Sequence, residues 1–172
     1  MAKRIAVLVA DHYDDLEYSQ PVAAFLAAKH QVSNIAPQAG VIVHGNQRHS
    51  SAQIHHSITD ISIDDFDALF IPGGKSALTL ANHPQVISFI QAFNHAKKSI
   101  FSICDGALLL NAANILQDRI ITSLRQYATC FEKAGAIYYD AELVNDNNQL
   151  ISSRKNEDLP VFIHECLNVL RH

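Results

Sequence analysis

The sequence predicts an α/β protein with a mostly parallel, doubly wound sheet and helices on both faces. Short apolar runs of strand length alternate with longer segments of helical periodicity. The runs are continuously apolar, which is typical of strands covered on both faces. No internal repeat or low-complexity tract interrupts this alternation. Together these observations favour a flavodoxin-like sheet with small antiparallel hairpins, built as one domain over residues 1–172.

The apolar runs define the strands. The expected strands are residues 5–10, 30–35, 67–71, 100–103 and 119–122. Two alternating segments with polar turns, 41–56 and 136–152, are expected to fold back as antiparallel hairpins. All other connections between strands are long enough to hold a helix, so the main sheet is expected to be parallel.

Helical periodicity and proline positions define the helices. Pro21 suits a first helical turn, so residues 11–17 are expected to form an acidic loop after the first strand. Pro84 is expected to interrupt the long helix over 76–96. The other expected helices are 105–114, 126–134 and 157–170.

Composition excludes several classes of partner. The 172 residues carry a net charge of -4, which gives no reason to expect nucleic acid or an anionic membrane. The apolar run 5–10 is too short for a signal peptide and is followed by acidic residues. Three cysteines far apart in sequence indicate neither a disulfide framework nor a zinc ribbon, so a cytoplasmic location is expected.

Cys104 follows a predicted strand and directly precedes a predicted helix. This order is typical of a nucleophile elbow, whose corner residue projects its side chain at the carboxyl end of the sheet. Gly106 supplies the small residue that the close approach of strand and helix requires. A thiol beside a helix N-terminus is expected to ionise readily, because free N–H groups favour negative charge. The alternative is an inert core cysteine.

Glu17, Gly73 and Gly74 are expected to lie near Cys104, because all four follow strands whose carboxyl ends share one edge. Beside a thiolate, the economical state of Glu17 is a protonated carboxyl that donates to sulfur. The N–H groups of Gly73, Gly74 and Asp105 are candidate donors to a developing oxyanion. The alternative interpretations are a solvated loop carboxylate and a plain Pro-Gly-Gly turn.

Asp105 is also a candidate catalytic residue, because it directly follows Cys104, where a base for the nucleophile would be well placed. A carboxylate there also raises the pKa of the thiol by repulsion. An acidic residue in a first helical turn is, in addition, a good helix start, and that role is the favoured interpretation.

Metal and cofactor motifs give no signal. The histidines near the first hairpin, His44, His49, His55 and His56, match no ligand spacing. Gly73 and Gly74 lack the glycine run and lysine of a phosphate loop, and no dinucleotide fingerprint follows the first strand. We therefore expect neither a metal nor a cofactor.

Several motifs taken together resemble the ThiJ/PfpI superfamily, specifically the PfpI branch of intracellular protease-like and general stress proteins. The motifs are Asp15-Leu-Glu17-Tyr, Phe66-Asp-Ala-Leu-Phe-Ile-Pro-Gly-Gly74, Ser102-Ile-Cys104-Asp-Gly106, Ala134-Gly-Ala136 and the stretch 151–160. The resemblance is collinear over residues 3–170. It implies a flavodoxin-like sandwich that self-associates as dimers or larger homo-oligomers, with Cys104 as the elbow cysteine and Glu17 as its hydrogen-bonding glutamate. Family activities include cysteine-type peptidase, cofactor-free glyoxalase and deglycase action, besides redox-sensing and chaperone roles.

The sequence departs from the PfpI branch at three positions. Asp105 stands where the branch has a histidine, and the acidic residue and arginine that follow the Gly-Gly turn align with Leu78 and Ala81. Neither leucine nor alanine transfers a proton, so the Cys-His-acid triad is incomplete and peptidase activity is not expected. The histidine is not obligatory across the superfamily, so the resemblance itself stands.

Three functions remain open. The first is an enzyme that uses Cys104 as nucleophile and Glu17 as proton relay on small reactive aldehydes such as methylglyoxal. The second is a non-catalytic redox-sensing or chaperone-like stress protein, in which an oxidant modifies Cys104. The third is a binding pseudoenzyme whose pocket is remodelled by Asp105, Leu78 and Ala81. The partners expected are therefore a small-molecule carbonyl substrate or an oxidant, and further copies of the chain.

Overall fold

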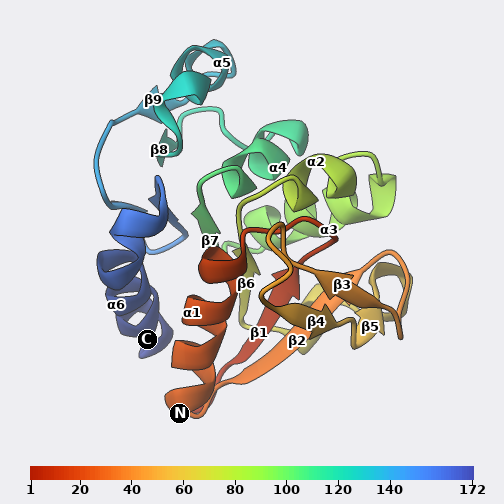
Figure 1. Ribbon diagram of the computed structural model, residues 1–172. Helices are drawn as coiled ribbons and strands as arrows, with labels where there is room; N and C mark the ends of the chain where they lie inside the picture. The colour runs from red at the N-terminus through yellow and green to blue at the C-terminus, as the bar shows by residue number, and fades with distance from the viewer.

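The computed structural model describes residues 1–172, and a seven-stranded sheet forms its centre (Figure 1). The strand order is β10-β11-β7-β6-β1-β2-β5. The strands are β1 (Arg4–Leu8), β2 (Gln31–Ala36), β5 (His56–Ser57), β6 (Ala68–Ile71), β7 (Ser99–Ile103), β10 (Val144–Asp146) and β11 (Leu150–Ser153). Every neighbouring pair is parallel except β10 with β11. The predicted fold class is confirmed.

The direction in which the sheet grows reverses between β1 and β6. β2 and β5 extend the sheet on one side of β1, whereas β6, β7 and β11 extend it on the other. Connections leave such a switch point in opposite directions and open a crevice beyond the carboxyl ends of the strands. The loops after β1 and β6 and the corner after β7 all lie at this edge.

Helices cover both faces of the sheet (Figure 1). The helices are α1 (Asp15–Ala27), α2 (Ser76–Leu80), α3 (Pro84–His95), α4 (Gly106–Ala112), α5 (Ala128–Lys133) and α6 (Leu159–Leu170), with 3-10 turns at Ile58–Asp60, Ile63–Asp65, Arg125–Tyr127 and Asn156–Asp158. Because alternate side chains of a strand point to opposite faces, β6 contributes Phe70 to the core under α1 and α6, and Leu69 to the core under α2, α3 and α4. None of these helices is long and apolar enough to cross a membrane.

The first of the two predicted hairpins is confirmed, and the second forms only in part. β3 (Ile42–His44) and β4 (Ser51–Gln53) form the first as a separate antiparallel pair. In the second, only β10 and β11 pair, whereas β9 (Ile137–Tyr138) pairs in parallel with β8 (Ile120–Ile121). α5 lies between β8 and β9 in the chain and supplies the crossover that parallel pairing needs.

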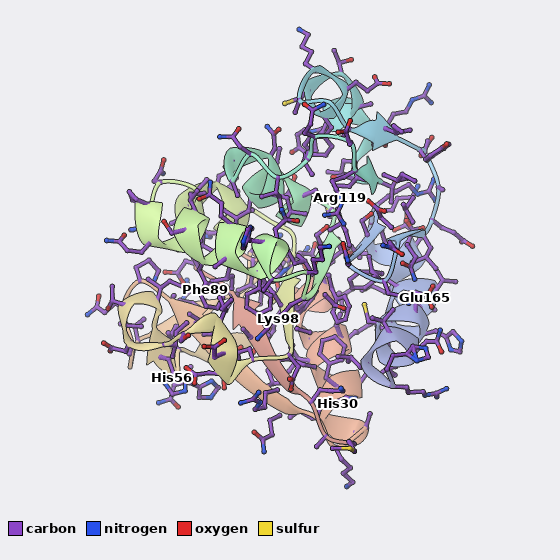
Figure 2. All side chains as sticks on the ribbon, turned by 180° about the vertical axis from the view of Figure 1, so that it is seen from behind. His30, His56, Phe89, Lys98, Arg119 and Glu165 are labelled. Atoms are coloured by element: carbon purple, nitrogen blue, oxygen red, sulfur yellow. The ribbon has the colours of Figure 1, made fainter.

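Two cations fix the back of the sheet, in the view of Figure 2. Lys98 donates to the carbonyl oxygens of Ile63 (2.6 Å) and Phe66 (2.8 Å), which ties the segment before β6 to the start of β7. Arg119 donates to Asp146 (2.7 Å) and thereby joins β8 to β10. These three hydrogen bonds lie near the amino ends of β6, β7 and β11, away from the crevice.

α1 begins earlier than Pro21 predicts. The Asp14 side chain accepts hydrogen bonds from the N–H groups of Leu16 (3.1 Å) and Glu17 (3.0 Å), and this N-cap starts the helix at Asp15. Pro21 lies inside the helix and has no N–H to donate to the Glu17 carbonyl. The predicted acidic loop over 11–17 is therefore too long, and Glu17 belongs to the first turn of α1.

Candidate functional site

Cys104 follows β7 directly at the corner before α4, as predicted, but the helix begins at Gly106 rather than at Asp105. The Cys104 φ of 57° lies in the left-handed region, which costs a non-glycine residue on the order of 1–2 kcal/mol. Hydrogen bonds on both sides hold the corner. The Cys104 N–H donates to the Ser153 carbonyl (3.1 Å), and the Cys104 carbonyl accepts from the Ser123 hydroxyl (2.7 Å). The strain is therefore maintained by the neighbouring strand β11 and the segment after β8.

Gly106 opens α4 where the helix crosses the end of β6. A side chain there would overlap the carbonyl oxygen of Ile71, so only glycine fits. The helix is seven residues long. This close crossing brings the elbow against the Pro-Gly-Gly turn that follows β6.

Backbone hydrogen bonds join the loop after β1 to that turn. The Asp14 N–H donates to the Gly73 carbonyl (3.0 Å), and Tyr13 forms an isolated β-bridge with Gly74. A Cβ atom on Gly73 would overlap Glu17 Oε1 and would lie 2.9 Å from Cys104 Cβ. The missing side chain of Gly73 thus leaves the space in which the Glu17 carboxyl and the Cys104 side chain meet.

Glu17 is almost completely buried, with 2% of its surface exposed. Its pKa is raised to about 8, mainly by burial and in addition by the Asp14 and Asp105 carboxylates, while the Cys104 side chain and the Gly73 N–H oppose the shift. Glu17 is therefore mostly protonated at neutral pH and carries a proton beside the sulfur. Because Glu17 is buried within α1, the alternative of a solvated loop carboxylate is excluded.

The environment of Cys104 opposes ionisation, contrary to the expectation for a helix N-terminus. Burial raises the pKa of the thiol, the Glu17 and Asp105 carboxylates add to the shift, and the Asp105 N–H opposes it. A protonated Glu17 exerts no such repulsion, so Asp105 is the charge that matters at neutral pH. The short helix α4 does not outweigh these effects, and the resting nucleophile is a thiol.

Asp105 lies at the N-cap position of α4, as the helix-start interpretation expects, but its carboxylate makes no capping hydrogen bond. Its Oδ2 atom accepts from the Gly74 N–H (3.2 Å) and from the Cys104 thiol (3.8 Å), and its Oδ1 atom accepts from the Tyr127 hydroxyl (2.6 Å). These partners turn the side chain away from its own helix and toward the sulfur.

The three predicted oxyanion donors surround Cys104, but they are not equally free. The Asp105 N–H lowers the pKa of the Cys104 thiol, and the Gly73 N–H lowers that of Glu17. The Gly74 N–H is already bonded to the Asp105 carboxylate. An oxyanion would have to compete with that carboxylate for the Gly74 N–H.

Two contributors to the site could not be found from sequence. Tyr127 lies 22 residues after its partner Asp105, and Ser123 lies 19 residues after Cys104. An aromatic residue near a helix and a serine after a strand are ordinary in a fold of this class, so only the tertiary structure reveals their contacts.

The other residues that the sequence singled out add no polar group to the site. Leu78, where the branch has its acid, is 56% exposed on α2, and Ala81 ends that helix. No three His, Cys, Asp or Glu side chains gather as a metal site. Cys104 is partly exposed but lines none of the five surface cavities.

Comparison with known proteins agrees with this architecture. The sequence pattern of the DJ-1/PfpI family matches residues 3–169. "Protein/nucleic acid deglycase 2" of Escherichia coli is 38% identical, and the match covers 99% of each chain. "General stress protein 18" of Bacillus subtilis is also 38% identical, again over 99% of each chain.

A solved structure shows the same fold. A two-domain protein of Anabaena variabilis, with DJ-1/ThiJ/PfpI-like and ferritin-like domains, superposes with a TM-score of 0.95 at 26% identity. The alignment covers 99% of this chain and 48% of that one. The elbow, the switch-point sheet and a match along nearly the whole sequence agree, and the chain belongs to the DJ-1/PfpI family.

Proposed function

We propose that the chain is a cysteine-dependent, cofactor-free enzyme of the stress response that acts on small reactive aldehydes, with glyoxalase-like or deglycase-like chemistry. The observation that carries the proposal is the Glu17 carboxyl, which is protonated at neutral pH and lies against Cys104 in a buried site. Proton carriers with a pKa near the working pH are the most effective ones. The name of the Escherichia coli relative, a deglycase, supports the same class of activity, and the name of the Bacillus subtilis relative supports a role in the stress response.

With methylglyoxal as substrate, each step can be assigned to these groups. The Cys104 sulfur adds to the aldehyde carbon, and the thiol proton passes to the carbonyl oxygen through Glu17. Glu17 then relays the proton of that carbon to the neighbouring ketone carbon, while the hydroxyl proton passes to the ketone oxygen, which leaves a lactoyl thioester. One water molecule cleaves the thioester to lactate and restores the thiol. The net reaction consumes one aldehyde and one water and needs no outside oxidant.

The groups around Cys104 favour a slow enzyme. The resting nucleophile is a thiol, and the Gly74 N–H is occupied. General acid or base assistance is commonly worth roughly 10² to 10⁴ in rate, and the chain lacks the histidine that would supply it beside the sulfur. This arrangement also argues against peptidase activity, because an amide is much less reactive than an aldehyde.

Conversion of methylglyoxal to lactate by the purified protein tests the proposal. Turnover should be lost in Cys104→Ala and should fall by about 10²-fold or more in Glu17→Gln, which keeps the shape of the carboxyl but cannot relay a proton. Cys130→Ala, at an exposed cysteine, is the matched control and should keep full turnover. Equal lactate formation by wild type and Cys104→Ala would contradict the proposal.

One observation favours a second candidate, a redox-sensing stress protein. Cys104 lines no cavity, and hydrogen peroxide needs less room than an aldehyde adduct. Against it, sulfenate and sulfinate are anionic and would lie beside the Asp105 carboxylate. Mass spectrometry after mild peroxide treatment distinguishes the two. Oxidation of Cys104 before the exposed Cys130 would support the sensor, and the reverse order would exclude it.

We further propose that the chain self-associates as a dimer or larger homo-oligomer in a reducing cytoplasm. All three cysteines are free, which suits that compartment. Two exposed leucines support the assembly. Leu16 (46% exposed) precedes Glu17, and Leu78 (56% exposed) follows the Gly73-Gly74 turn, so an apolar contact there would also narrow the access to Cys104.

A further inference from the structure

The Asp105 carboxylate links three elements of the site within one chain. Its Oδ1 atom accepts from Tyr127, the last residue of the Arg125–Tyr127 turn, at 2.6 Å. Its Oδ2 atom accepts from the Gly74 N–H after β6, at 3.2 Å, and from the Cys104 thiol, at 3.8 Å. The short contact to Tyr127 is a charge-assisted hydrogen bond, and it fixes the direction in which the carboxylate points.

The charged groups that act on the Cys104 thiol are carboxylates. α1 and its N-cap present Glu17 and Asp14, the elbow presents Asp105, and the turn before α5 presents Tyr127. Glu17 holds its own proton at neutral pH. The charge in direct contact with the thiol is therefore the Asp105 carboxylate.

We propose that Asp105 is a restraint on the nucleophile and that Tyr127 is the positioning residue that holds it there. The carboxylate retains the proton on Cys104 by accepting its hydrogen bond, and it occupies the Gly74 N–H that would otherwise bind an oxyanion. A carboxylate that is hydrogen-bonded to both the thiol and the Gly74 N–H opposes the attack of the sulfur. It also opposes stabilisation of the oxyanion that the attack forms. The second of these effects rests on the proposed function, whereas the first does not.

The restraint can be measured without any substrate, because only the thiolate reacts with iodoacetamide. Alkylation of Cys104 is followed by peptide mass spectrometry between pH 6 and 10. In Asp105→Asn, which keeps the shape and removes the charge, the rate at pH 7 should rise about tenfold or more, as a fall of one pKa unit in the thiol requires. Cys130 is the internal reference, because it is exposed and its sulfur contacts Asn111 rather than Asp105, and its rate should not change.

Tyr127→Phe tests the positioning role. Loss of the hydroxyl frees the carboxylate to turn away, so the alkylation rate of Cys104 should rise by about threefold, less than in Asp105→Asn. In the double variant the Tyr127→Phe change should add nothing, because it acts only through Asp105. Tyr138→Phe is the matched control, since its hydroxyl donates to the Ser123 carbonyl and does not touch Asp105. It should leave the rate unchanged.

Two results would overturn the proposal. One is an unchanged or slower alkylation of Cys104 in Asp105→Asn, which would show that the carboxylate has no effect on the thiol or acts as its base. The other is an equal effect of Tyr127→Phe with and without Asp105. Asp105→Ser provides a second uncharged variant should Asp105→Asn not fold. A negative result in the aldehyde assay has no bearing on the alkylation rates of Cys104, so the two experiments test the restraint and the proposed enzyme activity independently.

Discussion

A carboxyl group and a thiol in contact inside a protein share protons according to their surroundings. Here the backbone determines which group is charged. Asp14 caps α1 and places Glu17 in a space left open by Gly73, where burial favours the neutral acid. The sulfur of Cys104 lies beside Asp105, where the thiol is favoured over the thiolate. At residue scale the site is therefore a neutral pair next to one fixed negative charge.

The raised pKa of Glu17 makes stability depend on pH. The folded state holds the proton up to about pH 8, whereas the unfolded chain releases it near pH 4.5. The contribution of this group is therefore complete below pH 4.5 and is lost as pH rises toward 8. Glu17→Gln does not titrate, so its free energy of unfolding relative to wild type should increase between pH 5 and 9, on the order of a few kcal/mol.

Urea unfolding at pH 5, 7 and 9 measures this difference. Glu132→Gln, at an exposed position of α5, is the control and should follow the wild type at every pH. A difference between Glu17→Gln and wild type that stays constant with pH would show that Glu17 titrates as an ordinary carboxyl.

The left-handed conformation of Cys104 predicts an unusual order of stability. Alanine at this position keeps the backbone strain, whereas glycine relieves it. Cys104→Gly is therefore expected to be more stable than Cys104→Ala by about 1 kcal/mol, as judged by urea unfolding. In most strands and helices the order is the reverse, and the reverse order here would show that the corner relaxes when the sulfur is removed.

At the scale of elements, the crossing of α4 over the end of β6 determines how near the elbow lies to the Pro-Gly-Gly turn. Gly106→Ala tests this crossing. Alanine favours a helix, but its Cβ atom would overlap the Ile71 carbonyl, so we expect a loss of about 1–3 kcal/mol in the free energy of unfolding.

The alkylation rate of Cys104 should change along with that loss of stability. Gly40→Ala is the control, because that glycine has open space around it and only a positive φ of 82°. It should lower stability without changing the reactivity of Cys104. An unchanged Cys104 rate in Gly106→Ala would show that the elbow does not depend on this crossing.

The elements that the sequence predicted well are those with continuous apolar runs. β1, β6 and β7 have all or nearly all of their residues buried, and proline marked the break between α2 and α3 correctly. The predicted start of α1 was wrong, because the N-cap at Asp14 outweighed the preference of Pro21 for a first helical turn. The partner of β9 was wrong because two short strands carry no signal of their pairing.

The same limit applies to the site. Loops at the carboxyl ends of parallel strands are predictable as neighbours, so the sequence alone is enough to expect Glu17, Gly73 and Cys104 at one edge of the sheet. The direction of the Asp105 side chain is not predictable, because it depends on Tyr127, which the sequence places in a helix over 126–134 without indicating its distant partner. Contacts between a loop and a distant turn follow from tertiary packing rather than from local pattern.

At the scale of the whole molecule, the carboxyl edge of the sheet carries the site, and the termini lie near each other at the opposite end (Figure 1). Exposed leucines flank the site at the N-terminal turn of α1 and on α2. A contact through this edge would cover the shallow surface around Cys104. Assembly and chemistry would then depend on the same face.

Leu16→Glu and Leu78→Glu test that dependence. Each should shift the sedimentation coefficient toward that of a single chain, because a charge would be buried in the contact. Leu26→Glu is the matched control, since it changes an equally exposed leucine at the other end of α1. If the three variants sediment like wild type, the leucines lie outside any contact between copies.

The hydrogen bond from the Cys104 N–H to Ser153 also has a consequence for biosynthesis. β11, which carries Ser153, is the last strand to leave the ribosome, and Ser123 and Tyr127 likewise follow the cysteine. A nascent chain that ends before residue 150 contains the sulfur without Ser153, whose carbonyl holds the N–H of the corner. The thiol should therefore acquire its native reactivity only after β11 has been translated and has paired with β7.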